Sequence, residues 1–305
     1  MSHQTFSCFG SRCGLWVTGA GAASAIADAR RILENWQVRF SRFLGSSELS
    51  RLNADPRVVV PVSTTMAQLL RVVREAAEAT GGLVDGTLAR EIEDAGYGSD
   101  LAAPLPLALA LRLAPPRRPA RPRPWRDFTV DGWEVTRPPG LAFDSGGLAK
   151  GLFADLIAER LAGFESFAVD CGGDVRFAGP ERTVAVADPF GGVPLHRFRL
   201  STGAVATSGI GRRSWLDPGG RPAHHLLDPA TGRQAFTGVV QATALAPTAV
   251  EAEWRAKAAV LSGPETARDW LPHGGIVVLD DRSHFTVPVQ DLVPQDGPLL
   301  LTANP

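Results

Sequence analysis

Two kinds of apolar pattern alternate along this chain, and their mixture restricts the folds that it can adopt. Apolar residues that recur every three or four positions predict a long helix over residues 22–43. Further helices are expected at 64–79, 149–161 and 251–261, with Ser63 capping the first of these three and Gly81 and Gly82 ending it. Strand-like runs are shorter and more numerous: 13–18, 58–62, 128–130, 134–136, 141–144, 167–170, 175–178, 183–187, 195–200, 204–208, 238–245 and 275–289. This mixture indicates an α+β fold.

Length and composition limit the number of domains and the kinds of partner. The chain has 305 residues, 44% of them hydrophobic, which is enough for one large core. We expect a single domain over residues 1–305, with mixed, mainly antiparallel sheets and flanking helices. A formal net charge of −1 lacks the basic excess of a nucleic-acid binder. No uninterrupted apolar run reaches about 18 residues, so membrane insertion is not expected.

The cysteines and the N-terminal residues bear on the cellular compartment. Cys8, Cys13 and Cys171 are few and irregularly spaced, which argues against a disulfide framework. The N-terminal residues do not combine a basic start with a long apolar run, so we expect no signal peptide. Together these features favour a cytoplasmic location.

Residues 103–126 differ from the rest of the chain, because they are rich in proline and arginine. The ordinary interpretation is an exposed, extended connection on the surface. The alternative is a basic arm that contacts a partner or a phosphate group. The spacing of the residues leaves both interpretations open.

A glycine-rich turn precedes the helix expected at 149–161. Asp144 ends an apolar run, Gly146 and Gly147 follow, and Lys150 lies in the first turn of the helix. Adjacent glycines let the backbone approach a ligand, helix N-terminal amides favour an anion, and a lysine supplies a mobile cation suited to a diphosphate. The alternative is a tight strand-to-helix turn with a surface lysine. The spacing matches neither a Walker motif nor a Rossmann fingerprint.

A second glycine pair, Gly172 and Gly173, lies between Asp170 and Asp174 at the end of another strand. Bare backbone at this point could lie against a ligand ring or a phosphate. By itself, however, the pair is more typical of a β-bulge or turn. Cys171 is more typical of a small buried residue than of a reactive thiol.

Two further polar groups follow. Thr207 and Ser208 precede a glycine, and His225 lies three residues before Asp228 in a His-Leu-Leu-Asp-Pro-Ala-Thr-Gly segment. Paired histidines can bind a metal or transfer protons, although a histidine pair is more often structural. Glu253 and Lys257 are four residues apart on a predicted helix, and such a pair is ordinarily an exposed ion pair.

Taken in order, these motifs resemble the ApbE family of FAD:protein FMN transferases, and the resemblance covers most of the chain. Residues 9–11 stand where relatives show Met-Gly-Thr, and residues 85–87 resemble Asp-Pro-Thr. The segment 144–151, continuing to Asp155, resembles Asp-Leu-Gly-Gly-Ile-Ala-Lys-Gly. Residues 40–43 and 47–53 are close matches as well. The Gly-Gly-Asp, Thr-Ser-Gly and His-x-x-Asp-Pro-x-Thr-Gly motifs then follow at the spacing of the family.

The resemblance implies that FAD binds in a cleft and that a Thr or Ser hydroxyl of an acceptor protein attacks its diphosphate. FMN would become linked to that residue and AMP would leave. The residues implied to bind FAD are Ser41, Asp85, Asp144, Gly146, Gly147, Lys150, Asp155, Gly172, Gly173, Thr207 and His225. Ser208, His225 and Asp228 would line the reacting end, with His225 as the base. The alternatives are a pyrophosphatase that splits FAD into FMN and AMP, and an FAD-binding protein with lost or altered catalysis.

The sequence departs from the family at the implied metal site. In the family, Mg²⁺ binds a backbone carbonyl that corresponds to Ala149, together with an Asp and a Thr four residues apart on a helix. Those two positions are Glu253 and Lys257 here. A protonated lysine cannot ligate a metal. We therefore expect an atypical metal site, with Ala149 and Glu253 as the candidate ligands, and FAD binding that does not strictly require magnesium.

Overall fold

An antiparallel sheet of eight strands organises the structure. The computed structural model describes residues 1–97, 105–112, 125–217, 219–290 and 292. Every pair of neighbouring strands in this sheet is antiparallel. The strand order is β1 (Ser2–Cys8), β2 (Ser11–Thr18), β6 (Ser166–Cys171), β7 (Val175–Val186), β8 (His196–Gly209), β13 (Val239–Ala246), β14 (Gly275–Leu279) and β15 (His284–Val287).

Three long helices cover one face of this sheet: α1 (Ala22–Phe40), α6 (Ala149–Leu161) and α7 (Ala249–Ser262). The side chains of strand β6 alternate between the two faces of the sheet. Its Phe167, Val169 and Cys171 join the core under the helices, whereas Ala168 belongs to a separate apolar cluster with Phe177. The expected α+β fold of mixed helices and mainly antiparallel sheet is therefore confirmed.

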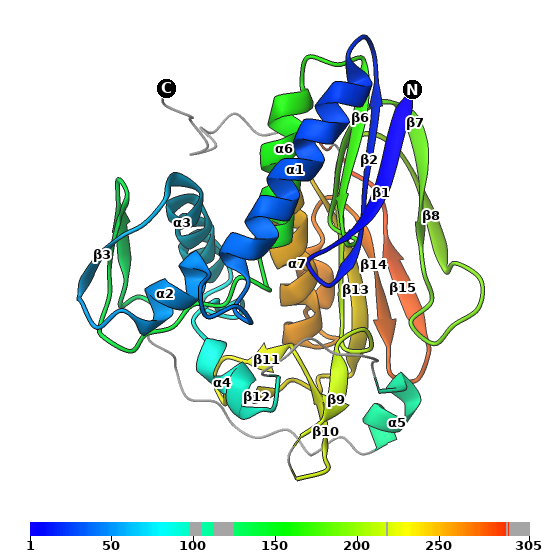
Figure 1. The fold of residues 1–305 in the computed structure, drawn as a ribbon. Helices are drawn as coiled ribbons and strands as arrows, with labels where there is room; N and C mark the ends of the chain where they lie inside the picture. The colour runs from blue at the N-terminus through cyan, green and yellow to red at the C-terminus, as the bar shows by residue number, and fades with distance from the viewer. Residues whose placement is uncertain (98–104, 113–124, 218, 291, 293–305) are drawn as a thin grey trace.

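Smaller elements pack around the ends of the helix layer (Figure 1). One group contains α2 (Glu48–Ala54), α3 (Thr64–Ala79) and a three-stranded sheet of β3 (Val59–Pro61), β4 (Thr129–Asp131) and β5 (Glu134–Thr136). The other contains α4 (Ala89–Asp94), α5 (Leu107–Arg112), β9 (Ser214–Leu216), β10 (Pro222–His224), β11 (Leu227–Asp228) and β12 (Arg233–Gln234). A short 3-10 helix, η1 (Ala267–Trp270), follows α7.

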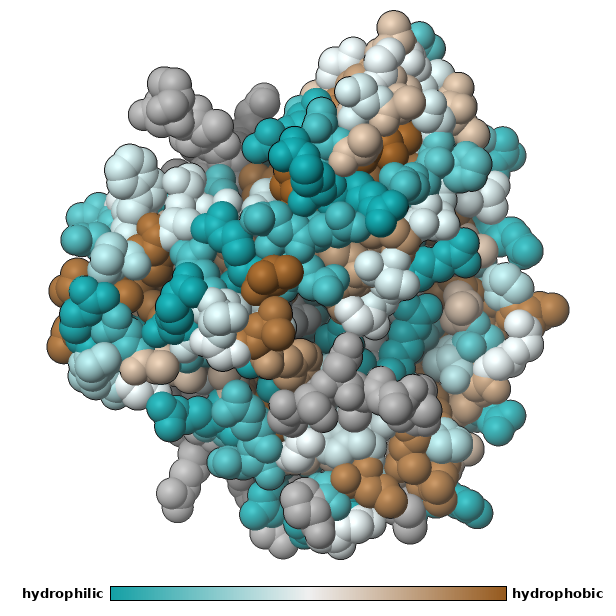
Figure 2. Space-filling model, viewed as in Figure 1, coloured by the Kyte–Doolittle hydropathy of each residue, from teal (hydrophilic) through white to brown (hydrophobic). Residues whose placement is uncertain are grey.

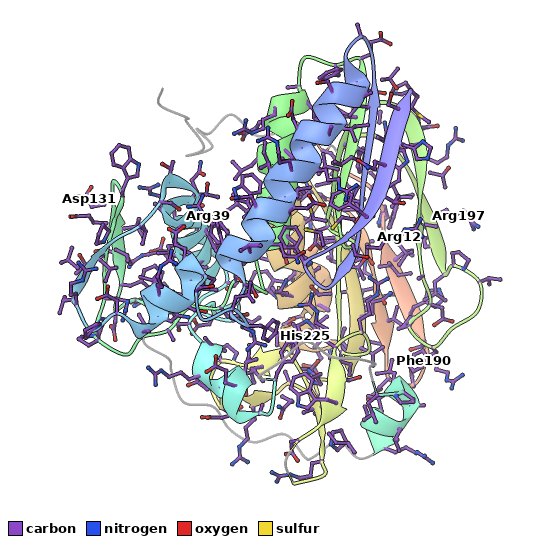
Figure 3. The ribbon with its side chains drawn as sticks, in the orientation of Figure 1. Arg12, Arg39, Asp131, Phe190, Arg197 and His225 are labelled. Carbon is purple, nitrogen blue, oxygen red and sulfur yellow. The ribbon has the colours of Figure 1, made fainter. Side chains whose placement is uncertain are left out.

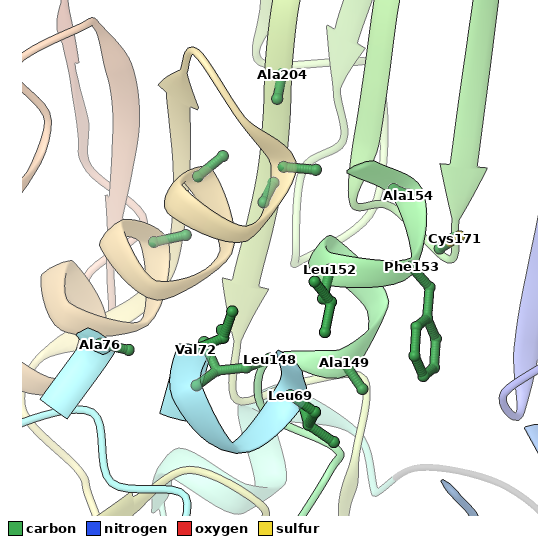
Figure 4. Close-up of a cluster of buried hydrophobic side chains, with 14 of the residues drawn as sticks. Leu69, Val72, Ala76, Leu148, Ala149, Leu152, Phe153, Ala154, Cys171 and Ala204 are labelled. Carbon is green, nitrogen blue, oxygen red and sulfur yellow. The ribbon is translucent and has the colours of Figure 1, made fainter. Parts of the chain in front are cut away.

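The core joins the first of these groups to the helix layer. Figure 4 shows Leu69, Val72 and Ala76 of α3 gathered with Leu148 and Leu152 around the start of α6. All five side chains are buried. The start of α6 is thus held in a packed environment, and this is where the glycine-rich turn lies. On the outer face drawn in Figure 2, hydrophilic residues predominate and apolar ones form scattered groups.

Most expected elements are present, with differences at their ends. Ser63 caps α3 by accepting a hydrogen bond from the Met66 amide at 3.2 Å. Helix α1 ends at Phe40 rather than at residue 43, and the N-terminal strand β1 was not predicted. Within residues 103–126 the structure describes helix α5 and residues 125–126, whereas 103–104 and 113–124 lie outside the described residues.

The strand predicted over residues 141–144 is wrong. The backbone of Phe143 bonds to the side chain of Asn53 through both its N–H and its C=O, each at 2.8 Å. The amide of Asp144 then donates to the carbonyl of Gly86 at 2.8 Å. These local bonds satisfy the backbone without a neighbouring strand.

Helices α6 and α7 are joined by a buried carboxylate, that of Asp155. Its two oxygens accept hydrogen bonds from the amides of Ala249 and Val250, at 2.8 and 2.9 Å. These amides open helix α7 and have no partner within it, so Asp155 satisfies donors that burial would otherwise leave unpaired.

Replacing Asp155 with Ala should therefore destabilise the fold by about 2 kcal/mol, because two buried amides lose their acceptors. Urea unfolding at pH 8, above the pKa of about 7 that burial gives Asp155, measures the change. Asp28→Ala removes a carboxylate whose side chain is 61% exposed and is the matched control. Equal stability of the two variants would contradict the assigned role.

Candidate active site

A cleft opens where the ends of several elements meet, beside the starts of α6 and the small strands. It is bounded by the residues after α1, the loop at 83–88, the glycine-rich turn, residues 225–227 and the side of α7. Figure 3 shows His225 near the centre of the molecule, close to the lower end of α7 in this view. Nine of the residues singled out in the sequence line the cleft: Ser41, Asp85, Asp144, Gly146, Gly147, Ala149, Lys150, His225 and Lys257.

A hydrogen bond to the end of α1 fixes the position of the glycine-rich turn. The Ser145 hydroxyl donates to the carbonyl of Phe40 at 2.8 Å and so ties the turn to the end of α1. Helix α6 begins at Ala149, and its N-cap residue Leu148 makes no side-chain cap hydrogen bond. The amide of Gly151 in the first turn instead donates to a side chain of α7, Oε2 of Glu253, at 2.9 Å.

Four charged side chains form a buried cluster behind the turn. Lys150 forms an ion pair with Asp174, and its Nζ lies 3.6 Å from Oε1 of Glu253. The Nζ of Lys257 lies 3.1 Å from the same oxygen, while Oε2 of Glu253 accepts the Gly151 amide at 2.9 Å. The side chains of Asp174 and Glu253 are 2% and 1% exposed, so both carboxylates depend on these cations.

The cluster shifts the pKa values of its members in opposite directions. Burial by itself would lower the pKa of Lys150, but Asp174 and Glu253 outweigh it and raise that pKa. Burial raises the pKa of Asp174 to about 6, and the negative charge of Glu253 adds to this effect. Burial also acts to raise the pKa of Glu253, but Lys257 and Lys150 outweigh it and lower that pKa. Both ammonium groups thus favour the ionised form of Glu253.

Another part of the cleft lining is aromatic and carries a buried guanidinium. The guanidinium of Arg42 lies against the rings of Phe43 and Tyr97, at 4.6 and 4.4 Å from their centroids, and these two rings meet edge to face at 5.6 Å. Tyr97 in turn stacks on Trp215 at 4.9 Å. The Nε of Arg42 lies 3.5 Å from Asp144, but its two terminal nitrogens are buried and have no hydrogen-bond partner among the described residues. These two nitrogens can donate hydrogen bonds to acceptor atoms of a bound ligand.

His225 is an uncharged imidazole in this cleft. Burial, followed by the nearby positive charges of Arg213, lowers its pKa well below the ordinary value. Its Nδ1 is buried and has no partner within the described part of the chain. A neutral ring nitrogen of this kind can accept a proton. The neighbouring His224 lies against the ring of Phe236 at 4.6 Å, and burial lowers its pKa to about 3, so its role is packing.

Seven of the predicted site residues do not line the cleft: Asp155, Gly172, Gly173, Thr207, Ser208, Asp228 and Glu253. Several of them instead stabilise neighbouring strands and turns that do not line the cleft. Gly172 has a φ of 78° and approaches Ser11 so closely that a Cβ would lie 2.7 Å from the Ser11 Cβ. Thr207 bonds to Thr243 between neighbouring strands at 2.8 Å. Asp228 accepts from the amide of Ala230 and the hydroxyl of Thr231, and so stabilises its own turn.

Three lining residues received no role from the sequence. Arg42 and Tyr97 lie inside family-like motifs, whereas Arg213 carried no signal of its own. Asp174 was noted as the carboxylate that follows the second glycine pair, but its ion pair with Lys150 was not predicted.

Comparison with known proteins identifies the class of this fold and site. The model of the ApbE family matches residues 9–279, so the chain belongs to the ApbE family. The FAD:protein FMN transferase of Treponema pallidum is 30% identical over 79% of this chain and 72% of its own length. That of Vibrio cholerae is 29% identical over 77% of this chain and 72% of its own length.

Solved structures share the fold. The ApbE protein of Thermotoga maritima superposes with a TM-score of 0.78 and 24% identity, over 93% of this chain and 96% of its own. The flavinyl transferase ApbE of Pseudomonas stutzeri gives a TM-score of 0.73 and 19% identity, over 94% and 93% of the two chains. The arrangement of helices on an antiparallel sheet is therefore that of these structures.

The charged cluster makes a prediction about stability. Lys150→Met should lower the free energy of unfolding by about 3 kcal/mol, because it leaves two buried carboxylates with one cation between them. The exposed pair of Arg199 and Glu181 provides the control, and Arg199→Met should change stability by less than about 0.5 kcal/mol. Urea unfolding of both variants gives the two values. A Lys150→Met variant as stable as the control would rule out a tightly coupled cluster.

Proposed function

We propose that this protein transfers FMN from FAD to a Thr or Ser of an acceptor protein and releases AMP. The observation that carries the proposal is the pair of lysines that line the cleft beside the glycine-rich turn, in a chain of the ApbE family. Relatives that match most of this chain are named FAD:protein FMN transferases, which supports the same reaction here.

The two walls of the cleft suit the two chemical parts of FAD. Its diphosphate is an anion, and the ammonium groups of Lys150 and Lys257 with the backbone at Gly146 and Gly147 would bind it. Its rings are planar, and Phe43, which lines the cleft and is 38% exposed, offers an aromatic surface for stacking. Ser41, Asp85 and Asp144 also line the cleft and would contribute polar contacts.

The reaction is a displacement at phosphorus. The acceptor hydroxyl forms a new O–P bond to the phosphate of the FMN half, and the bond from that phosphorus to the bridging oxygen breaks. The bridging oxygen leaves with AMP. The hydroxyl proton passes to Nδ1 of His225, which is uncharged and has no partner in the described structure. Ser208 and Asp228, implied by the family resemblance, would act from behind the cleft by positioning the strand and turn that carry this site.

The residues present do not fit a magnesium ion at the position that the resemblance implies. The Nζ of Lys257 lies 3.1 Å from Oε1 of Glu253, where a metal ligated by that oxygen would lie. The other oxygen of Glu253 is bonded to the Gly151 amide. Among the described residues, no group of three or more His, Cys, Asp or Glu could hold a metal. We therefore route no step through Mg²⁺.

Two features concern the setting of the reaction. None of the described helices is long and apolar enough to cross a bilayer. The three cysteines are buried and unpaired, which fits a reducing compartment, and we propose the cytoplasm.

A mass measurement tests the proposed function. The protein is incubated with FAD and an acceptor protein that presents an Asp-x-x-Ser/Thr-Gly-Ala/Ser-Thr segment. We expect the acceptor to gain the mass of one FMN and AMP to appear in equal amount. An acceptor whose Ser/Thr is replaced by Ala is the control and should stay unmodified. Free FMN with AMP would instead indicate a pyrophosphatase, and intact bound FAD would indicate a binding protein.

His225→Gln should slow transfer by about a hundredfold or more, because the acceptor hydroxyl loses its base. FAD affinity should fall much less than the transfer rate, since the amide is uncharged like the imidazole that it replaces. His224→Gln is the matched control, because His224 is buried next to His225 but lies outside the cleft lining. Single-turnover transfer rates and FAD fluorescence titrations separate the two effects. Equal rates for both variants would exclude His225 as the base.

A further inference from the structure

We propose that Lys257 is a built-in cation that binds the diphosphate in place of a divalent metal, so that FAD binding and FMN transfer need no magnesium. This inference rests on the proposed function and names the group that supplies the positive charge.

The position of Lys257 differs from that of an ordinary helical ion pair. Pairs four residues apart on a helix are usually exposed and contribute only about 0.3–0.5 kcal/mol. Here the side chains of Glu253 and Lys257 are 1% and 9% exposed. Lys257 also lines the cleft, where its Cε lies 3.6 Å from the point at which a Cβ on Gly147 would sit. The ammonium therefore lies beside the glycine-rich turn and not on the surface.

Charge and space together exclude a metal from the same place. Two ammonium groups, those of Lys257 and Lys150, already surround Oε1 of Glu253 at 3.1 and 3.6 Å. Asp174 is paired with Lys150, so two carboxylates and two ammonium groups balance within the cluster. A divalent ion on Glu253 would have to displace Lys257 and would add two positive charges beside Lys150. Ammonium and metal are thus alternatives at this point.

The use of lysine in the whole chain points to the same conclusion. Of the 31 basic residues, only Lys150 and Lys257 are lysine, and all the others are arginine. Both lysines lie in this one cluster, within reach of one carboxylate oxygen. A guanidinium is broad and planar, whereas an ammonium is a compact point charge. Lysine at these two positions therefore fits a requirement for a small cation, which is also what a metal ion provides.

Magnesium titrations of FAD binding test the proposal. Wild-type protein should bind FAD with the same affinity in EDTA and in millimolar Mg²⁺, within about twofold. Lys257→Met removes the charge and keeps much of the side-chain length, so affinity should fall by about tenfold or more, and Mg²⁺ should not restore it. The double variant Glu253→Asp with Lys257→Thr recreates the family pattern and should bind FAD weakly in EDTA but recover with Mg²⁺. Thermal melting of each variant verifies its folding.

Lysine modification gives a second readout that does not depend on activity. Reductive methylation can label only the N-terminal amine and the two lysines, because the chain contains no others. Saturating FAD should protect Lys257 from labelling equally in EDTA and in Mg²⁺, while the N-terminus is labelled throughout and serves as the internal control. Peptide mass spectrometry reports each site separately.

Several outcomes would overturn the proposal. These are FAD binding by the wild-type protein that is lost in EDTA, an affinity of Lys257→Met equal to that of wild type, or labelling of Lys257 that FAD does not reduce. Calorimetric titration of Mg²⁺ alone into wild-type protein should give no saturable heat, and a saturable one would also contradict it. FMN transfer to an acceptor is scored separately by mass, so a protein that binds FAD without Mg²⁺ but transfers nothing refutes the proposed function and not the role of Lys257.

Discussion

The carboxylate of Glu253 is the contact on which the site depends. Its side chain is almost completely buried, and a buried charge is costly unless every oxygen has a partner. One oxygen accepts the amide of Gly151 and so joins α7 to the first turn of α6. The other lies between the ammonium groups of Lys150 and Lys257. A single acidic residue thereby positions a helix N-terminus and two cations around one side of the cleft.

The aromatic part of the cleft lining is held together by ring contacts instead of ion pairs. The guanidinium of Arg42 lies against the rings of Phe43 and Tyr97, and Trp215 stacks on Tyr97. These contacts hold the guanidinium without using its terminal nitrogens, which have no partner in the described residues. A charged wall and an aromatic wall therefore face one cleft, and a nucleotide that combines a diphosphate with flat rings presents both matching chemistries.

The large sheet supports the site through residues that do not line the cleft. Strands β6, β8 and β13 carry the Gly172 turn and the Thr207–Thr243 contact, and neither lines the cleft. Asp155 holds the start of α7 against α6 and Asp228 stabilises its own turn. Motif residues of this kind contribute to the shape of the cleft, because they position the helices and turns that carry the lining residues.

The sequence by itself determined the helices, most strands, the mixed α+β class and the family, because periodic apolar patterns and the order of local motifs are properties of neighbouring residues. It also placed Lys150, the glycine-rich turn and His225 at the site. Only the tertiary structure decided which residues meet across long separations, such as Arg42 with Tyr97, or Gly151 with Glu253. It also showed that 141–144 is not a strand, since Asn53 satisfies the backbone there. The glutamate–lysine pair was visible in the sequence as an ordinary helical spacing, but its burial beside a second lysine depends on how α6 packs on α7, and no local pattern contains that information.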